Sequence, residues 1–451
     1  MSNGEVEPFS RHAQGAAQAI RERRITSEAL TEFCLERIRQ SESQVNAWAH
    51  IDPELARRQA RAADQALQRM DRPHGPLHGV PVGLKDIFDT ADLPTENGTV
   101  LDAGRRPPKD ALVVSLLRDA GAVILGKTVT TELATYAPGP TANPRDVART
   151  PGGSSSGSAA AVAAAMVPLA LGTQTNGSVI RPAAYCGVVG FKPTRGTIAR
   201  TGVLMQSATL DQVGVFANSV ADAALLAQLI MSANAGRGDA PPLAHPDLLR
   251  GLDAPLPTPR LAFARSPVWE EAEPATRDIF LQWAETAAGG LPSVELPQAC
   301  DTAVACHRTI GEAELAKAYE SYYAKGKTRL SPQLRGMIER GQKVSDSAYD
   351  GALAGMAAIG EALSQVFSRH DALITPATTG EAPVGLASTG SPIFCTLWTL
   401  CGLPCVTLPL LSGPAGMPLG VQVVGPVGSD AKLLRIAQWL MDLSRSEQEP
   451  R

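Results

Sequence analysis

Apolar residues near the start of the chain recur three and four positions apart, which is the spacing of one face of an α-helix. They are Leu30, Phe33, Cys34 and Ile38. Ser27 precedes them and is a residue type that often caps a helix N-terminus. Asp52 followed by Pro53 forms a second cap and first-turn pair, which predicts another helix through Met70. Residues 1–70 are therefore predicted to form an N-terminal set of helices.

Beyond this section, short apolar runs alternate with helical patterns. Residues 77–82 and 122–125 predict short buried strands, and residues 111–120 between them predict a helix. An alanine-rich stretch at residues 159–171 predicts a core helix, and residues 405–424 return to strand-like runs. Such alternation is typical of a layered α/β domain.

The composition is that of a globular protein, with 44% hydrophobic and 19% charged residues in a chain of 451. The 41 Lys and Arg are balanced by 45 Asp and Glu, which leaves a net charge of -4, and aromatic residues make up only 4%. A chain without a basic field or many stacking aromatics is not expected to bind nucleic acid directly.

Neither a membrane span nor an export signal is predicted. The apolar stretch at residues 159–171 is broken by Pro168 and is shorter than the about 20 residues that cross a bilayer. Residues 1–10 contain two glutamates and lack the apolar core of a secretory signal. Seven cysteines without a C-x-x-C pair predict a reducing, cytoplasmic setting and no structural metal. Three clustered cysteines, expected to be buried free thiols, are Cys395, Cys401 and Cys405.

One short motif fits a phosphate-binding loop. Residues 121–128 read GAVILGKT, which matches G-x-x-x-x-G-K-[ST]. In a true loop of this kind a strand precedes the first glycine, whereas here the apolar residues between the glycines are themselves the predicted strand. We therefore expect no nucleotide binding and interpret Lys127 as an ordinary lysine at a strand end.

A second motif, GSSSG at residues 153–157, matches the G-x-S-x-G nucleophile elbow of serine esterases. An elbow requires a strand directly before it, but the preceding residues 143–150 are polar. The histidines that could complete a triad are predicted to lie in connections or on helix surfaces; they are His245, His307 and His370. An elbow-type serine esterase is the weaker alternative.

The most informative pattern is a series of Gly-, Ser- and Thr-rich segments. They are TPGGSSSGS at 150–158, LGTQTNGSVIRP at 171–182 and CGVVGFKPT at 186–194, together with GVPVGLKD at 79–86, LDQVG at 210–214, ITP at 374–376, GLP at 402–404 and PLGVQ at 418–422. This set strongly resembles the amidase signature family, serine amidases that use a Ser, a second Ser and a Lys. The resemblance covers nearly the whole chain and is least diagnostic at residues 235–370.

The resemblance implies an α/β fold in which a central mixed β-sheet is covered by helices on both faces, an α/β/α arrangement. It implies a single domain over residues 1–451 and no metal or organic cofactor. The expected sections are the N-terminal helices at 1–70, a signature core at 75–220, a variable and mostly helical section at 235–370, and a return to the core at 371–451.

Carried over position by position, the resemblance makes Ser178 the nucleophile, Ser154 the bridging serine in a cis peptide and Lys85 the base, with Ser155 and Thr173 in support. Chemistry agrees with these roles. A serine hydroxyl attacks an amide only when a base removes its proton, and Ser-Lys pairs are known variants of the serine triad.

A lysine acts as a base near neutral pH only when its ammonium form is destabilised. The apolar neighbours Val82, Leu84 and Ile87 predict that Lys85 is buried enough for this.

The glycine-containing turn before the nucleophile is expected to form the oxyanion hole. Its backbone N–H groups can converge on the carbonyl oxygen that becomes negative during attack, and a well-placed donor contributes about 3 to 4 kcal/mol. The donors are expected at Thr175, Asn176, Gly177 and Ser178.

Departures from the family pattern concern the substrate. Most relatives carry Asp where this chain has Gln174, Gly where it has Asn176, and an Arg one position nearer the nucleophile than Arg181. With no acid at position 174, Arg181 could bind a substrate carboxylate in a bidentate fork, a pattern that resembles malonamidase. Alternatively, Arg181 pairs with Glu132, Glu314 or another acid.

The predicted function is hydrolysis of the C–N bond of a small primary amide, one that could bear a carboxylate, through an acyl-enzyme on Ser178. The alternative is the amidase subunit of a glutamine-dependent tRNA amidotransferase, and a scaffold without activity is disfavoured by the intact Lys85, Ser154 and Ser178. The expected partner is a small-molecule amide rather than nucleic acid or a membrane, and a homodimer stays open.

Overall fold

The computed structural model describes residues 3–70, 72–232 and 247–448. In this part of the chain, eleven strands form one mixed sheet in the order β1-β3-β2-β4-β6-β5-β10-β11-β9-β7-β8. The strands are β1 (Trp48–Ile51), β2 (Pro81–Lys85), β3 (Val123–Thr128), β4 (Leu169–Gln174), β5 (Val189–Lys192), β6 (Gln212–Ala217), β7 (Leu261–Arg265), β8 (Ser293–Glu295), β9 (Ala372–Pro376), β10 (Cys405–Ser412) and β11 (Pro418–Val424).

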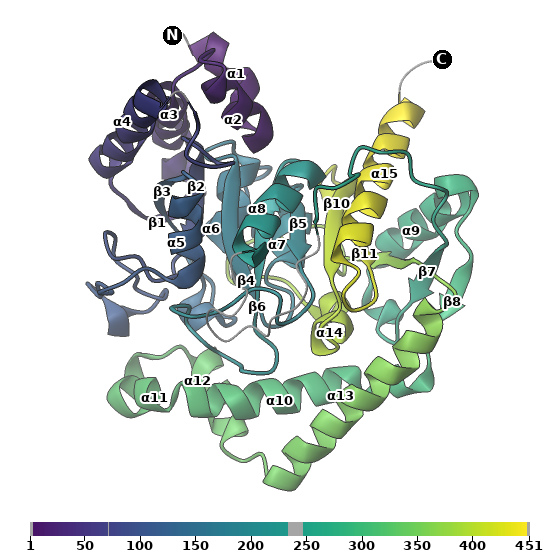
Figure 1. Cartoon of the computed structure of the whole chain (residues 1–451). Helices are drawn as coiled ribbons and strands as arrows, with labels where there is room; N and C mark the ends of the chain where they lie inside the picture. Colours follow the sequence, from purple (N-terminus) through teal and green to yellow (C-terminus); the bar gives the residue numbers. More distant parts are fainter. Residues whose placement is uncertain (1–2, 71, 233–246, 449–451) are drawn as a thin grey trace.

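Helices surround this sheet (Figure 1). They are α1 (Asn3–Ser10), α2 (Ala13–Arg21), α3 (Ser27–Val45), α4 (Pro53–Met70), α5 (Leu112–Asp119), α6 (Ser156–Ala163), α7 (Ile180–Cys186), α8 (Val220–Ser232), α9 (Pro274–Thr286), α10 (Ala303–Ala318), α11 (Glu320–Gly326), α12 (Pro332–Gly341), α13 (Asp346–Phe367), α14 (Ile393–Leu400) and α15 (Asp430–Gln448). Within the described residues, none of the helices combines the length and the apolar character needed to cross a bilayer. His245 and the first residues of the section predicted at 235–370 lie outside the described residues.

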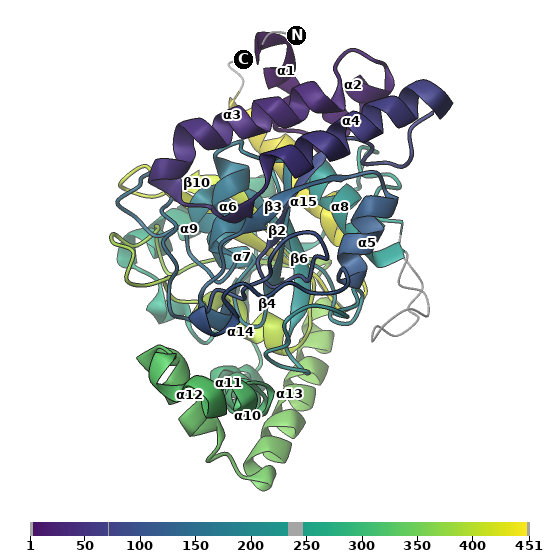
Figure 2. The ribbon, with the colours of Figure 1, turned by 90° about the vertical axis from the view of Figure 1, so that its left-hand side faces the viewer.

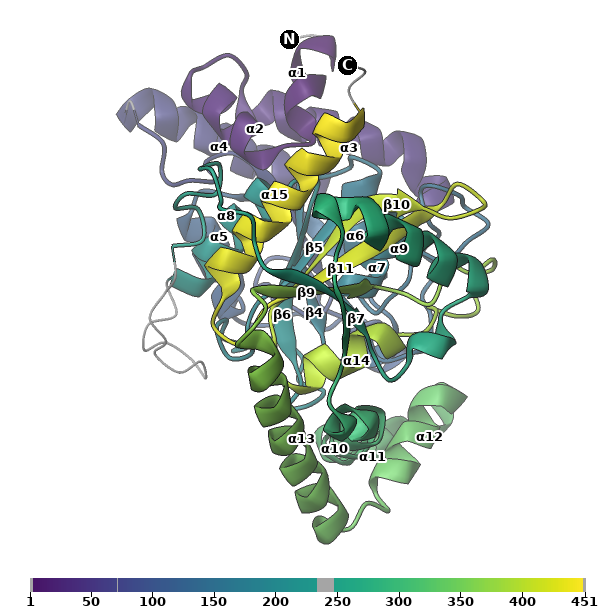
Figure 3. The same ribbon diagram turned by 90° about the vertical axis from the view of Figure 1, so that its right-hand side faces the viewer.

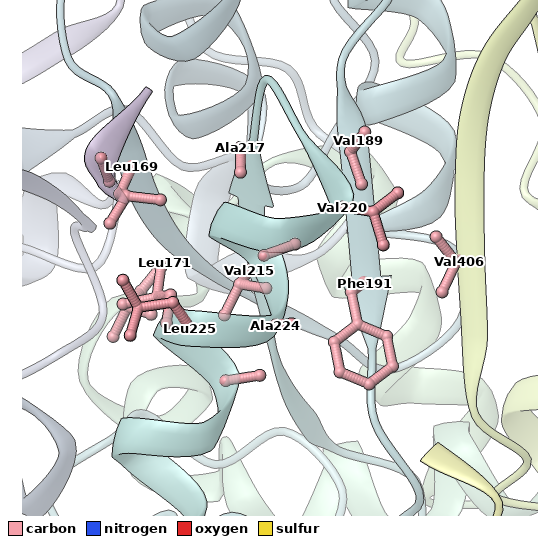
Figure 4. Packing of buried hydrophobic residues seen from close by; sticks show 14 of the residues in the cluster. Leu169, Leu171, Val189, Phe191, Val215, Ala217, Val220, Ala224, Leu225 and Val406 are labelled. Atoms are coloured by element: carbon pink, nitrogen blue, oxygen red, sulfur yellow. The ribbon is translucent and has the colours of Figure 1, made fainter. Parts of the chain in front are cut away.

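The predicted α/β/α arrangement is confirmed. Strand residues alternate between the two faces of the sheet, so Leu169 and Leu171 of β4 join one core cluster while Ala170 joins another. On the first face, α8 covers the sheet, and its Val220 and Leu225 lie over the apolar residues of β4, β5 and β6 (Figure 4). On the other face, α6 contacts β2 and β4, and α7 contacts β10 and β11.

Parallel pairing of strands near the β1 edge of the sheet positions the site residues. β2 lies between β3 and β4 and runs parallel to both, with Leu84 opposite Leu171. The carboxyl ends of β2 and β4 therefore meet at one edge of the sheet. This register brings Lys85, the last residue of β2, beside Thr173 of β4.

The mostly helical section, which contains α10 to α13, lies beyond the carboxyl ends of β2 and β4. In two views at right angles, α10 to α13 lie at one end of the molecule, whereas α3 and α4 lie at the opposite end (Figures 1 and 2). Helix α10 packs against α12, α13 and α14, and α13 leads from the far tip back toward β9 (Figure 3). In residues 247–370, the described part of this section, the helices α9 to α13 are joined by two strands, β7 and β8.

Several predicted elements are confirmed. Helix α4 begins at Pro53, and the Asp52 carboxylate accepts a hydrogen bond from the amide of Leu55 at 2.9 Å, as expected of a helix cap. The predicted helix at 111–120 is α5, and the apolar run at 122–125 opens β3. All seven cysteines are buried and free, including the three clustered near the C-terminus.

Other boundaries were predicted wrongly. Thr26, not Ser27, caps α3, because its hydroxyl accepts from the amide of Ala29 while the Ser27 hydroxyl donates to the carbonyl of Gly79 at 2.8 Å. The strand predicted at 77–82 begins only at Pro81. Residues 77–80 form a turn, since Gly79 has a φ of 75°, which a β-strand does not accommodate.

The apolar stretch at residues 159–171 is not a continuous helix. Helix α6 ends at Ala163, Ala165 adopts a left-handed φ of 54°, and β4 begins at Leu169. Pro168 lies between the two elements, and a proline at that place cannot continue a helix. The apolar composition thus belongs to a buried helix and a buried strand in succession.

Candidate active site

Lys85 is completely buried at the end of β2. Its Nζ donates hydrogen bonds to Ser154 Oγ at 2.8 Å and to Thr173 Oγ1 at 2.9 Å. Burial lowers the pKa of Lys85 from its ordinary value near 10.5 to about 7, and the negative charge of Asp211 opposes part of this decrease. Near neutral pH, a substantial share of this side chain is therefore the free amine, which can accept a proton.

The loop that carries Ser154 is hydrogen-bonded to β4 through the next residue, Ser155. The peptide bond between Gly153 and Ser154 is cis. Ser155 bonds to both backbone groups of Thr173, donating to the carbonyl at 3.2 Å and accepting from the amide at 3.3 Å. Ser155 is thus buried against β4, directly before α6, and residues 143–150 before this loop form turns rather than the strand of a nucleophile elbow.

Ser178 lies in the turn between β4 and α7, and 9% of its surface is exposed. The Gln174 side chain holds this turn, because its Oε1 accepts from the amides of Val179 at 2.8 Å and Ile180 at 3.0 Å. In the described part of the chain, no hydrogen bond joins the hydroxyls of Ser178 and Ser154, and none uses the amides of residues 176–178 as donors. Those amides can therefore bind a ligand oxygen.

A cavity of about 230 Å³ opens above Ser178. One wall is the turn at residues 175–178 together with Arg181. A second part of the wall is one face of α10, which contacts the turn through His307. The lining residues of α10 recur at helical spacing; they are Val304, His307, Arg308, Gly311 and Glu312. Lys85 and Ser154 are buried and are not among the residues that line this cavity.

Arg181 lines this cavity, is only 1% exposed, and does not pair with an acid among the described residues. Its two Nη atoms donate to the carbonyls of Gly390 at 2.5 Å and Gly153 at 2.6 Å, and in the described structure its Nε is buried without a partner. The predicted pairing with Glu132 or Glu314 is wrong: Glu132 accepts from the amide of Ser331. Glu314 accepts from residues 207, 209 and 349.

Two further predictions about single residues are corrected. Lys127 is not an ordinary strand-end lysine, because it is completely buried, lies 3.2 Å from the Asp86 carboxylate and donates to Thr95 Oγ1 at 2.6 Å. His307 is not on a helix surface. It is buried in the cavity wall, and its Nε2 lies 2.9 Å from the carbonyl oxygen of Thr175. Burial lowers the pKa of His307 below its ordinary value.

Sequence patterns named His307 only as a weak triad candidate for the elbow, because it lies in the section that is least similar to the family. The spacing of the α10 residues at 304, 307, 308 and 311 marks one helix face, but nothing in that pattern states that the face meets Ser178. Among the residues that the structure describes, no group of three or more His, Cys, Asp or Glu side chains is arranged to hold a metal ion.

Comparisons with known proteins show the family to which the chain is similar. A family model described as Amidase matches residues 29–434. The A subunit of the glutamyl-tRNA(Gln) amidotransferase from Chloroflexus aggregans is 36% identical, over 91% of this chain and 92% of that protein. A solved peptide amidase from Stenotrophomonas maltophilia has a TM-score of 0.81 and 28% identity, covering 96% of this chain and 97% of that chain. A solved 6-aminohexanoate cyclic dimer hydrolase has a TM-score of 0.84 and 26% identity, with coverage of 96% and 97%.

Proposed function

The chain belongs to the amidase family and is a C–N hydrolase, and from this premise we propose that it cleaves a primary amide through an acyl-enzyme on Ser178. The observation that carries the proposal is the buried amine of Lys85, 2.8 Å from Ser154 Oγ, together with a turn that presents Ser178 to a cavity. A base of lowered pKa, a relay hydroxyl and a nucleophile are the parts that serine-dependent amide hydrolysis needs.

The proposed reaction proceeds in two stages. Ser178 Oγ attacks the amide carbonyl while its proton passes by way of Ser154 to the neutral amine of Lys85. The amides of residues 176–178 stabilise the oxygen that becomes negative. The C–N bond then breaks, the nitrogen takes the proton back and leaves as ammonia. Water attacks the acyl-enzyme by the same route and releases the carboxylic acid and the free Ser178 hydroxyl.

The cavity favours a substrate that carries a carboxylate, as the malonamidase-like motif suggests. Arg181 lines the cavity and has no carboxylate partner in the described part of the chain. A buried cation is costly unless an anion or several hydrogen bonds compensate it. Its two carbonyl partners supply part of this compensation, and the carboxylate of a small amide substrate would supply the rest.

A second candidate, the amidase subunit of a glutamine-dependent tRNA amidotransferase, is favoured by the 36% identity to such a protein. Glutamine is also a primary amide with a carboxylate, but it carries an ammonium group that needs an acid. Among the described residues that line the cavity, Glu312 is the one acidic side chain. Both of its carboxylate oxygens already accept a hydrogen bond from Arg340 Nε at 3.0 Å. This arrangement favours an amide without an ammonium group.

Ammonia release from a panel of malonamate, glutamine, simple aliphatic amides and aryl amides distinguishes these candidates. We expect the isolated chain to release ammonia from malonamate more efficiently than from glutamine. The second candidate would be favoured if glutamine were the only amide in the panel that is turned over, or if turnover required the addition of amidotransferase partner proteins. An isolated chain that turns over none of these amides and takes no label on Ser178 would contradict the hydrolase mechanism itself.

Replacing Arg181 tests the carboxylate. A charged hydrogen bond contributes about 1.5 to 3 kcal/mol, so Arg181→Ala should lower kcat/KM for malonamate roughly ten- to a hundredfold. A neutral amide of the same size should be barely affected. Arg181→Lys should rescue little, because an ammonium cannot present the planar fork of a guanidinium. Equal losses for both substrates would instead mean that Arg181 only holds the segments of Gly153 and Gly390 in place.

A further inference from the structure

Three successive carbonyl groups in the turn before Ser178 accept hydrogen bonds. The carbonyl of Thr175 lies 2.9 Å from His307 Nε2, that of Asn176 accepts from Thr399 Oγ1 at 2.5 Å, and that of Gly177 accepts from the backbone amide of Arg181 at 3.0 Å. Each carbonyl belongs to the same planar peptide group as the N–H of the following residue. The three supported peptides are therefore those that carry the N–H groups of residues 176, 177 and 178.

A hydrogen bond to the carbonyl of a peptide polarises that peptide and makes its N–H a stronger donor. It also fixes the peptide plane, and with it the direction of the N–H. Both effects matter most where an N–H must stabilise a charge that appears only during the reaction, because a donor already in place needs no reorganisation.

We propose that His307 and Thr399 are positioning residues for the oxyanion hole, each orienting and polarising one peptide whose N–H faces the reacting carbonyl oxygen. His307 acts on the N–H of Asn176, and Thr399 acts on the N–H of Gly177. This inference rests on the proposed acyl transfer to Ser178. It assigns roles to two residues that lie outside the Gly- and Ser-rich segments, one on α10 and the other on α14.

The direction of each bond follows from its surroundings. A carbonyl oxygen only accepts, so His307 Nε2 carries a proton toward Thr175. The Thr399 hydroxyl accepts from Gln174 Nε2 at 2.9 Å, and that amide nitrogen only donates. The single hydroxyl proton of Thr399 is therefore committed to the carbonyl of Asn176.

Both donors are held firmly. Thr399 is completely buried, and His307 is 7% exposed. Thr175 is tied on its other side, since its hydroxyl donates to the Asp211 carboxylate at 2.6 Å. Hydrogen bonds to Asp211, in the loop before β6, and to His307, on α10, therefore both restrain Thr175.

Phosphonylation of Ser178 by a fluorophosphonate tests the inference without knowledge of the physiological amide, because the phosphoryl oxygen uses the same donors. His307→Met keeps volume but removes the donor, His307→Gln keeps an N–H of similar reach, and Thr399→Val keeps shape without the hydroxyl. We expect His307→Met and Thr399→Val to label Ser178 about tenfold more slowly than the unmodified protein, and His307→Gln to stay within about threefold. On an amide that is turned over, kcat should fall and KM should stay.

His78→Met is a matched control. His78 is also a buried histidine, and its Nε2 lies 3.1 Å from the carbonyl of Ala63, away from the cavity. Its replacement should lower the melting temperature as His307→Met does, yet leave the labelling rate unchanged. Unchanged labelling in both His307→Met and Thr399→Val, or equal losses in His307→Gln and His307→Met, would overturn this inference alone. Absence of any Ser178 adduct in the unmodified protein would overturn the proposed function with it. Should His307→Met fail to fold, Thr399→Val carries the same test.

Discussion

Replacement of Lys85 by methionine is expected to lower kcat for a primary amide by roughly 10²- to 10⁴-fold while the protein still folds. Methionine fills a similar volume among the apolar residues of β2, so the loss is confined to the chemical step. Without the amine, none of the described side chains bonded to Ser154 can take the proton that Ser178 must lose. Single-turnover kinetics together with a melting curve would measure both quantities.

The pH profile provides the second readout for Lys85. Because burial lowers the pKa of this amine to about 7, the unmodified protein should lose activity as the pH falls through about 7 and the amine becomes protonated. The Lys85→Met variant should lack this acid limb in its residual activity. Turnover near that of the unmodified protein, or an acid limb that persists at the same pH, would remove Lys85 from the mechanism.

Ser178→Ala should abolish the acyl-enzyme and lower turnover by at least about 10⁴-fold, since nucleophile and base act as a unit. Ser155→Ala is the matched control in the neighbouring loop. It removes the two bonds from the Ser155 hydroxyl to the backbone of Thr173 and should cost about 1 to 3 kcal/mol of stability. Its turnover should stay within about tenfold. A Ser155→Ala variant as inactive as Ser178→Ala would contradict this division of roles.

The fold and the contacts of Lys85 were predictable because the information for them is local or is carried by the segments that resemble the family. The Asp52–Pro53 pair predicted α4, and apolar patterns predicted α5 and β3. The parallel register of β2 and β4 then explains why Lys85 meets Thr173. Gly79, with its positive φ, shows where local reasoning failed, since an apolar run does not reveal the turn that delays a strand.

The contacts that sequence analysis missed join residues far apart in the chain. His307 reaches Thr175 across 132 positions of sequence, and Arg181 reaches Gly390 across 209. Asp86, which directly follows the neighbouring strand β2, is the charge partner that compensates the burial of Lys127. No periodicity within one segment contains such pairings, so they emerge only when the sheet and α10 are in place.

The most direct test of the central claim is the location of the covalent adduct after treatment of the whole protein with a fluorophosphonate. Peptide mass spectrometry should find the phosphonyl group on Ser178, the serine that lines the cavity beside the backbone amides of residues 176–178. An adduct on Ser155 instead, the central serine of the GSSSG segment, would contradict the account and restore the esterase-type elbow.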